Sequence, residues 1–189
     1  MGEHTYYGDA ANPTGFERNN ALFSYPEFGD QLIIGKFCAI ASGTKFILGP
    51  ANHRLCSVAT YTFQVFGGAW SALPPPHLAQ LPFRGDTVAG NDVWIGRDYH
   101  AGGKIGDGAI IAAYSAVAKD APPYTVFGGN PARLLKQRFD GELTELLLKF
   151  QWWNLEGEAL LKFLPLLCDG DLEKVKGELR RAIGGERLP

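Results

Sequence analysis

Small or apolar residues recur at a spacing of six in two stretches of this chain. In the first stretch they are Ile34, Ile40 and Phe46. In the second stretch they are Ala89, Ile95, Ile105, Ile111, Val117 and Pro123. A period of six is not that of an α-helix or of a simple alternating strand, but it is typical of a parallel β-helix built from hexapeptides. The pattern therefore predicts an all-β core in which each short strand buries one side chain and a tight turn follows it.

One step in the second stretch is short. Ile95 and Ile105 are ten residues apart, whereas two hexapeptide steps require twelve. We expect this coil to close through Tyr99, His100 and the two glycines that follow Ala101, because glycine tolerates strained backbone. A shortened corner of this kind could reshape a neighbouring groove.

A long segment, residues 49–86, separates the two stretches and contains His53 and a run of three prolines at 74–76. A regular β-helix needs no such interruption, and long loops on a rigid scaffold often carry function. We therefore look for the chemistry of the protein here. The loop is rich in apolar side chains, which favour a hydrophobic pocket. They are Tyr61, Phe63, Phe66, Trp70, Leu73 and Leu78.

The period becomes helical after residue 138. Leu143, Leu147 and Phe150 lie on one helical face, with Asp140 placed to cap the helix. Two further helices are expected around Phe163 and Val175. The predicted organisation is a single domain with an irregular segment at 1–30, the β-helix at 31–138 with its inserted loop at 49–86, and a C-terminal α-helical tail at 139–189, anchored by Trp152-Trp153.

Composition narrows the function classes. The formal net charge of −2 argues against a nucleic-acid binder, which would carry a basic stripe. No apolar run is long enough to span a membrane, and no signal peptide is visible at the start. The three cysteines are far apart and predict reduced, mostly buried thiols in a cytoplasmic protein.

Several segments together carry a specific resemblance. They are residues 34–40, 51–54, 85–87, 90–96, 104–110 and 128–132, with the pair Trp152-Trp153. In these segments the chain resembles the hexapeptide-repeat xenobiotic acetyltransferases, the O-acetyltransferases that inactivate chloramphenicol and streptogramin A antibiotics. The resemblance implies a left-handed parallel β-helix, a rare exception to the right-handed crossover preference. It further implies a homotrimer with active sites at subunit interfaces, and a segment ahead of the tyrosine motif that begins shortly after Met1.

The resemblance makes His53 the catalytic general base. Acetyl-CoA brings an activated thioester, so the protein must chiefly remove the proton of the attacking hydroxyl, and a neutral imidazole suits this near neutral pH. The alternative is a solvent-exposed loop histidine. The other histidines, His4, His77 and His100, are scattered without paired spacing, so no metal site is expected.

The residues expected to contact the acceptor are Tyr6, Tyr25 and Trp94, which match aromatic positions of the family. Trp94 would pack the site and keep it dry. The alternative for Trp94 is an aromatic residue on the outer surface of the β-helix, and for the two tyrosines it is generic aromatic packing.

The residues expected to line the acetyl-CoA groove are Ser115, Lys119, Gly128, Gly129, Arg133 and Lys136. Arg133 and Lys136, with Arg138, would meet the phosphates. The alternative for this basic run is the solvated start of a helix.

Three functions remain open on the sequence alone. The first is acetylation of a hydroxyl on an apolar antibiotic. The second is a hexapeptide acetyltransferase for a sugar or nucleotide-sugar, although the loop is poor in the Asp, Glu and Asn that a sugar site uses. The third is a non-enzymatic trimeric β-helix in which the shortened coil no longer binds acetyl-CoA.

Overall fold

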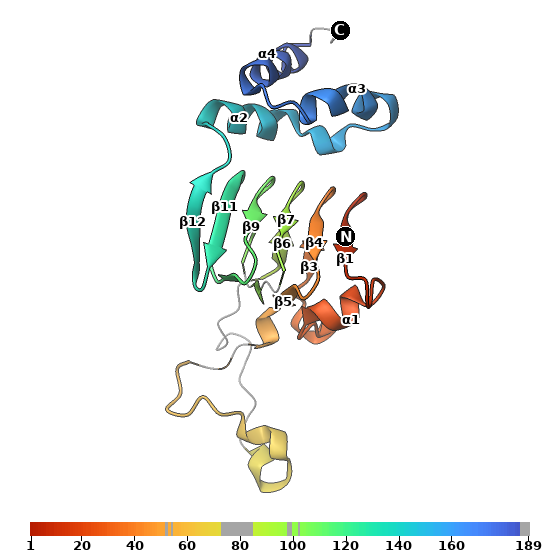
Figure 1. Ribbon diagram of the computed structural model, residues 1–189. Coiled ribbons are helices and arrows are strands. Elements are labelled where there is room, and N and C mark those ends of the chain that lie inside the picture. The colour runs from red at the N-terminus through yellow and green to blue at the C-terminus, as the bar shows by residue number, and fades with distance from the viewer. Residues whose placement is uncertain (52, 54, 73–84, 98–99, 102, 186–189) are drawn as a thin grey trace.

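The computed structural model describes residues 1–51, 53, 55–72, 85–97, 100–101 and 103–185. Figure 1 shows a row of short strands side by side, the C-terminal helices layered over one end of these strands, and the long loop extending away from the opposite end. The predicted tail and inserted loop therefore lie on opposite sides of the β-core.

Three sheets enclose the core. The first contains β1 (Tyr6–Gly8), β4 (Ala39–Ala41), β7 (Trp94–Ile95), β9 (Ile110–Ile111), β11 (Thr125–Gly129) and β12 (Ala132–Gln137). The second contains β2 (Ala21–Leu22), β5 (Lys45–Ile47), β8 (His100–Ala101) and β10 (Ala116–Val117). The third contains β3 (Leu32–Ile34) and β6 (Thr87–Ala89), extended by single bridges at Ile105 and Ala121. Every pairing is parallel except β11 with β12, which confirms the predicted parallel β-helix.

Each complete coil in the second stretch takes sixteen residues. Ala89 pairs with Ile105 and Ile105 with Ala121, while Ile95 pairs with Ile111. The buried positions therefore advance by six, six and four residues. A six-residue and a four-residue step together account for the ten residues between Ile95 and Ile105. The four-residue step recurs between Val117 and Ala121, so the short spacing is a regular feature of this β-helix.

Two sequence expectations change as a result. Pro123 is not a core position, because Ala121 and Phe127 are the buried residues of that coil. The short corner before Ile105 is also hydrogen-bonded to the equivalent corner of the next coil. The Lys104 amide donates to Asp120 Oδ1 at 2.9 Å, and Ala121 N donates to Lys104 O at 2.8 Å. Of the residues expected to close this corner, Tyr99 and Gly102 lie outside the described residues, as do Leu73, the three prolines at 74–76, His77 and Leu78.

A column of left-handed residues forms one corner of the helix. His4, Phe37, Asp92, Gly108 and Tyr124 all have φ between 51° and 67°. Their coils are joined by backbone hydrogen bonds: Asp92 N donates to Lys36 O, Gly108 N to Asn91 O and Tyr124 N to Asp107 O, at 2.8 to 2.9 Å. Left-handed backbone is unfavourable for L-residues other than glycine, so this corner is maintained by the stacking of coils.

Gly108 has no side chain, and the side chains of neighbouring residues occupy the space beside it. The Tyr124 ring lies where a Gly108 side chain would be. The Arg138 guanidinium donates to Gly108 O, lies 3.6 Å from Asp92 Oδ2 and is 5.6 Å from the centre of the Tyr124 ring. A carboxylate, a guanidinium and a buried phenol therefore share this corner.

The helical tail packs on the same corner. Its helices are α2 (Gly141–Phe150), α3 (Gly157–Leu167) and α4 (Leu172–Ile183), and a short turn of helix, η6 (Trp152–Asn154), joins α2 to α3. A second apolar cluster contains Tyr124, Leu143, Trp153 and Leu179, with Phe37 and Trp152 at its edge. The Trp152 and Phe37 rings are 4.8 Å apart. The tryptophan pair thus joins the tail to the β-helix, as the sequence predicts.

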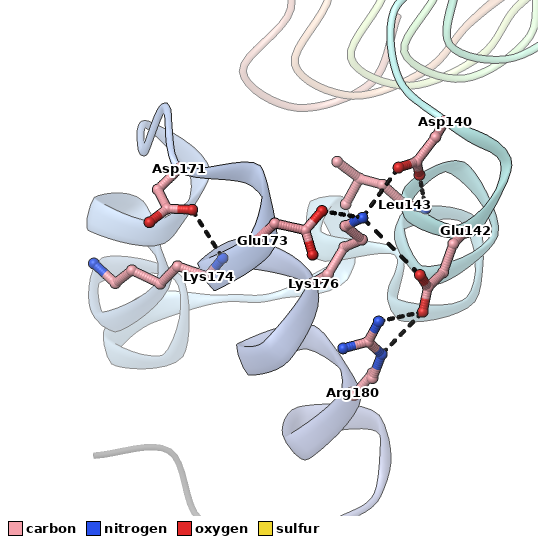
Figure 2. Close-up of polar contacts among 8 residues, drawn as sticks. All are labelled: Asp140, Glu142, Leu143, Asp171, Glu173, Lys174, Lys176 and Arg180. Atoms are coloured by element: carbon pink, nitrogen blue, oxygen red, sulfur yellow. Dashed lines mark hydrogen bonds and ion pairs between the residues drawn. The ribbon is translucent and has the colours of Figure 1, made fainter.

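An ion-pair cluster attaches α4 to the start of α2 (Figure 2). Lys176 Nζ lies 2.5 Å from Glu173 Oε1 and 3.0 Å from Asp140 Oδ2, although only 6% of this lysine is exposed. Asp140 also caps α2 by accepting the Leu143 amide at 2.8 Å, which confirms the predicted cap. The Leu143 amide and then Lys176 lower the pKa of Asp140.

The remaining short helices of the described residues are α1 (Phe16–Asn20), η1 (Pro26–Phe28), η2 (Gly49–Ala51), η3 (Phe63–Phe66) and η4 (Gly68–Ala72). Two cysteine expectations are wrong, since Cys38 is buried but Cys56 and Cys168 are exposed. The basic run is also not a helix start, because Arg133 and Lys136 lie on strand β12. None of the helices in the described part of the chain has the length and apolarity to cross a bilayer.

Gly108→Ala tests the corner column. The new methyl would overlap the Tyr124 ring on a backbone with φ of 67°, so we expect a loss of about 2 kcal/mol in unfolding free energy. Urea unfolding measures it. Gly141→Ala is the control, since a side chain at Gly141 meets open space. Equal stability of the two variants would contradict the role given to this corner.

Asp92→Asn tests the electrostatics of the corner. Burial raises the pKa of Asp92 to about 6, with Arg138 opposing the shift, against about 3.9 in an unfolded chain. From pH 4 to 6 the folded state therefore holds a proton that the unfolded chain releases, and stability falls as pH rises.

Because Asn cannot ionise, the variant lacks this loss. The unfolding free energy of Asp92→Asn minus that of the parent protein should therefore be about 1–2 kcal/mol larger at pH 7.5 than at pH 4.5, after allowance for partial exposure. Urea titrations at both pH values measure the difference. A pH-independent difference would show that Asp92 does not titrate in this window.

Candidate active site

Tyr6 and Trp94 lie in one outward-facing row of the first sheet. Tyr6 is opposite Ala39 in the β1–β4 pair, and Ala39 is opposite Trp94 in the β4–β7 pair. Their neighbours along the strands face the core: Ile40 and Ile95 are fully buried, whereas Tyr6 is 63% and Trp94 57% exposed. Strands β1, β4 and β7 lie side by side in Figure 1. The structure therefore brings two of the three predicted acceptor residues onto one surface.

Tyr25, the third predicted acceptor residue, is not part of this row. It directly precedes η1, its carbonyl accepts the Phe28 amide, and its ring lies 6.2 Å from the Phe28 ring. Tyr25 is 46% exposed, so its ring is accessible.

His53 lies on the loop that follows β5, in the second sheet. Its ring is exposed, and Nδ1 lies 2.7 Å from the backbone oxygen of Thr60. A carbonyl oxygen can only accept, so a hydrogen bond here requires the proton on Nδ1, and in the neutral imidazole this leaves the Nε2 lone pair free. This is the tautomer that a general base needs. The contacts of the described residues do not join His53 to Tyr6 or Trp94 within the chain.

Asp30 anchors the start of the loop, and the sequence pattern did not single it out. Its Oδ2 accepts the Gly49 amide at 2.7 Å, four residues before His53. Asp30 is only 6% exposed, and Oδ1 is buried with no hydrogen-bond partner among the described residues. A lone aspartate before a strand carries no distinctive signal, so only the folded chain reveals this contact.

Exposed aromatic side chains gather further along the loop. The Tyr61 ring is 5.0 Å from that of Phe63, and Trp70 is 5.7 Å from Phe63 and 5.9 Å from Phe66. Tyr61, Phe66 and Trp70 are each at least half exposed. Exposed apolar patches of this kind mark surfaces that contact a ligand or another protein.

Most of the predicted cofactor residues meet where β10, β11 and β12 adjoin. The Gly129 amide donates to Ser115 Oγ at 3.1 Å, and Gly128 is opposite Arg133 in the β11–β12 pair. Lys136 is opposite Val126 in the same hairpin, and both basic residues are exposed. This hairpin places two cations beside a glycine strand.

Two of these residues depart from the simplest expectation. Ser115 is 1% exposed and its hydroxyl donates to Ala112 O at 2.7 Å, so it shapes the turn under Gly129. Lys119 lies at another corner, where it lines a cavity of about 470 Å³ with Lys104, Thr87 and Asp120.

Comparison with known proteins identifies the family. The chain is 52% identical over 151 residues to a probable macrolide acetyltransferase of Lysinibacillus sphaericus, covering 79% of this chain and 83% of the relative. It is 45% identical over 178 residues to the virginiamycin A acetyltransferase of Staphylococcus aureus, covering 93% and 80%. This chain belongs to the hexapeptide-repeat xenobiotic acetyltransferase family. The chloramphenicol acetyltransferase of Agrobacterium fabrum (strain C58 / ATCC 33970) is 38% identical over 176 residues, covering 91% and 83%.

Membership makes the protein an acyltransferase, for which acetyl-CoA is the implied acyl donor, and argues against the non-enzymatic alternative. Among solved structures, a hexapeptide-repeat acetyltransferase of Vibrio cholerae is similar at 25% identity and a TM-score of 0.45, covering 74% of this chain and 62% of that protein. No family model matches the chain.

Within the described part of this acetyltransferase, no three His, Cys, Asp or Glu side chains lie close enough together to hold a metal ion. The candidate chemistry centres on three separate features. These are the imidazole of His53, the outward row containing Tyr6 and Trp94, and the basic β11–β12 hairpin.

Proposed function

We propose that this acetyltransferase transfers the acetyl group of acetyl-CoA directly to a hydroxyl of an antibiotic of the chloramphenicol or streptogramin A type. The names of its relatives support this acceptor class. The exposed aromatic row and the aromatic loop favour a largely apolar acceptor over a sugar. The single observation that carries the mechanism is the 2.7 Å contact between His53 Nδ1 and the Thr60 carbonyl.

His53 acts as the general base. With Nδ1–H donated to Thr60, Nε2 accepts the proton of the acceptor hydroxyl as that oxygen attacks the acetyl carbonyl. Acetyl-CoA, when bound, supplies the activated thioester carbonyl. The Asp30 contact with Gly49 holds the start of the loop, which keeps the imidazole near one position. The same imidazole then returns the proton to the departing CoA thiolate.

The donor lies along the β11–β12 hairpin. The backbone of Gly128 and Gly129 pairs with the pantetheine arm, because glycine allows close approach. The Ser115 hydroxyl accepts a hydrogen bond from the Gly129 amide and so fixes the position of Gly129. The exposed Arg133 and Lys136 meet the phosphates. Lys119 lies at a different corner of the β-helix from this hairpin. In the proposed trimer, it contacts the same acetyl-CoA molecule only if it belongs to a neighbouring copy of the chain.

The assembly is a homotrimer of left-handed β-helices in the cytoplasm, with each active site at a subunit interface. His53 follows a strand of the second sheet, whereas Tyr6 and Trp94 project from the first. A neighbouring copy that brings its first sheet against the loop would complete the site. Such packing would also cover the exposed rings of Tyr61, Phe66 and Trp70.

His53→Ala tests the proposed base. Loss of the proton acceptor should lower kcat by about 10²–10⁴-fold, while the melting temperature stays near that of the parent protein because His53 is exposed. Thiol release from acetyl-CoA, with chloramphenicol and virginiamycin A as acceptors, measures turnover.

Leu55→Ala is the matched control for the loop. This side chain is 74% exposed, and its removal should leave turnover unchanged. Undiminished activity in His53→Ala would exclude His53 as the base. If the parent protein released no thiol with either acceptor, the proposed acceptor class would be wrong.

The double variant Arg133→Ala/Lys136→Ala tests the donor site. Removal of two phosphate partners should raise KM for acetyl-CoA about tenfold with little change in kcat, because these contacts act on ground-state binding. The effect should shrink as salt is added. Lys149→Ala, an exposed charge on α2, is the control. An unchanged KM would place the phosphates elsewhere.

A further inference from the structure

A cavity of about 190 Å³ lies between the left-handed corner of the β-helix and the helical tail. Helix α2, the end of α3 and the start of α4 supply its apolar lining. The apolar side chains of these helices are Leu143, Leu147, Leu166, Leu167, Leu172 and Val175. Leu143 and Val175 are buried, whereas Leu172 is 41% exposed, so the cavity opens beside Leu172. We call this space the tail cavity.

The opposite wall of the tail cavity contains a buried hydroxyl. Tyr124 is 1% exposed, and its Oη is buried with no hydrogen-bond partner among the described residues. Burial is the main reason that the pKa of Tyr124 is raised; Trp152 weakly opposes the shift, although its contact lacks hydrogen-bond geometry. The phenol therefore keeps its proton at neutral pH. A buried donor without an acceptor is costly, so a ligand that accepts this proton would be favoured.

The charged groups of the lining are already paired. The Arg138 guanidinium lies 3.6 Å from Asp92 Oδ2, and Lys174 lies 2.7 Å from Asp169 Oδ2. A charged ligand would therefore meet a like charge as well as an opposite one. A neutral hydroxyl fits better, because it can accept from Tyr124 and also donate to the carboxylate of Asp92, which has several acceptor sites.

The volume limits the size of the ligand. An apolar cavity of about 150 Å³ is large enough to bind benzene. The tail cavity is slightly larger and therefore accommodates one six-membered ring with a small polar substituent.

We propose that the tail cavity binds a small neutral alcohol or phenol of about one ring. The hydroxyl of the ligand pairs with Tyr124, and its apolar part packs among the leucines of the three tail helices. His53, Tyr6 and Trp94 do not line this cavity, so the site is distinct from that of the proposed transfer reaction.

Two probes of similar shape test the proposal, 4-fluorophenol and fluorobenzene. The parent protein should bind 4-fluorophenol about 2- to 13-fold more tightly, because the phenol adds a hydrogen bond to the same apolar contact. Titrations followed by ¹⁹F NMR, without acetyl-CoA or acceptor, measure both dissociation constants. Failure of the parent protein to bind either probe, or equal affinity for the two, would overturn the proposal.

Tyr124→Phe removes the hydroxyl and keeps the ring. This variant should bind the two probes equally, with its affinity for fluorobenzene unchanged. Its melting temperature should equal or exceed that of the parent protein, because the substitution removes a buried hydroxyl that has no partner. A preference for 4-fluorophenol that survives in Tyr124→Phe would overturn the hydroxyl contact.

Leu172→Trp locates the binding site. The larger side chain should close the opening of the tail cavity and abolish binding of both probes. Leu161→Trp is the matched control, since Leu161 is 65% exposed on α3 and does not line the cavity, and it should bind as the parent protein does. Equal binding by the two tryptophan variants would place the probes elsewhere.

Chloramphenicol separates the tail cavity from the acceptor site. It is too large for the tail cavity and should leave 4-fluorophenol binding unchanged. Displacement of 4-fluorophenol by chloramphenicol would show that the probe occupies the acceptor site and would overturn the proposal. Because all of these measurements record binding, they do not depend on whether the protein acetylates either antibiotic class.

Discussion

The stacking of successive coils in a fixed register is the constraint on which the rest of the structure depends. Backbone hydrogen bonds link successive coils at the left-handed corner, from Asp92 N to Lys36 O and from Tyr124 N to Asp107 O. They hold left-handed backbone at Phe37 and Asp92, where isolated residues would avoid it. Once this register is set, it determines which side chains of the sheets face outward and which face the core, including the row that contains Tyr6 and Trp94.

The same corner also positions the tail. Tyr124 belongs to the left-handed column and to the apolar cluster under α2 and α4. Phe37 contacts His4 within the column and Trp152 in the tail, with ring separations of 4.8 Å in both cases. The tail is therefore an extension of the β-helix corner, and the Lys176 ion pairs then fasten α4 to α2.

The sequence predicted features that depend on local periodicity and failed where distant residues decide. Ile40 and Ile95 follow the hexapeptide pattern, and Asp140 caps its helix through a contact three residues away. Pro123 was misplaced because the four-residue step is visible only once two coils are aligned. The β11–β12 hairpin, the Asp30 contact with Gly49 and the opposition of Ala39 to both aromatic residues are long-range consequences of register.

The central claim is that one active site draws on two copies of the chain, with His53 from one and the aromatic row from the next. Co-expression of His53→Ala with Trp94→Ala, followed by measurement of thiol release by purified mixed trimers, tests this directly. In a trimer that contains both variants, one of the three interfaces pairs an intact histidine with an intact tryptophan, so the mixed trimers should recover about one third of the parent activity. Mixed trimers that are no more active than the His53→Ala or Trp94→Ala homotrimers would show that both residues must come from the same chain.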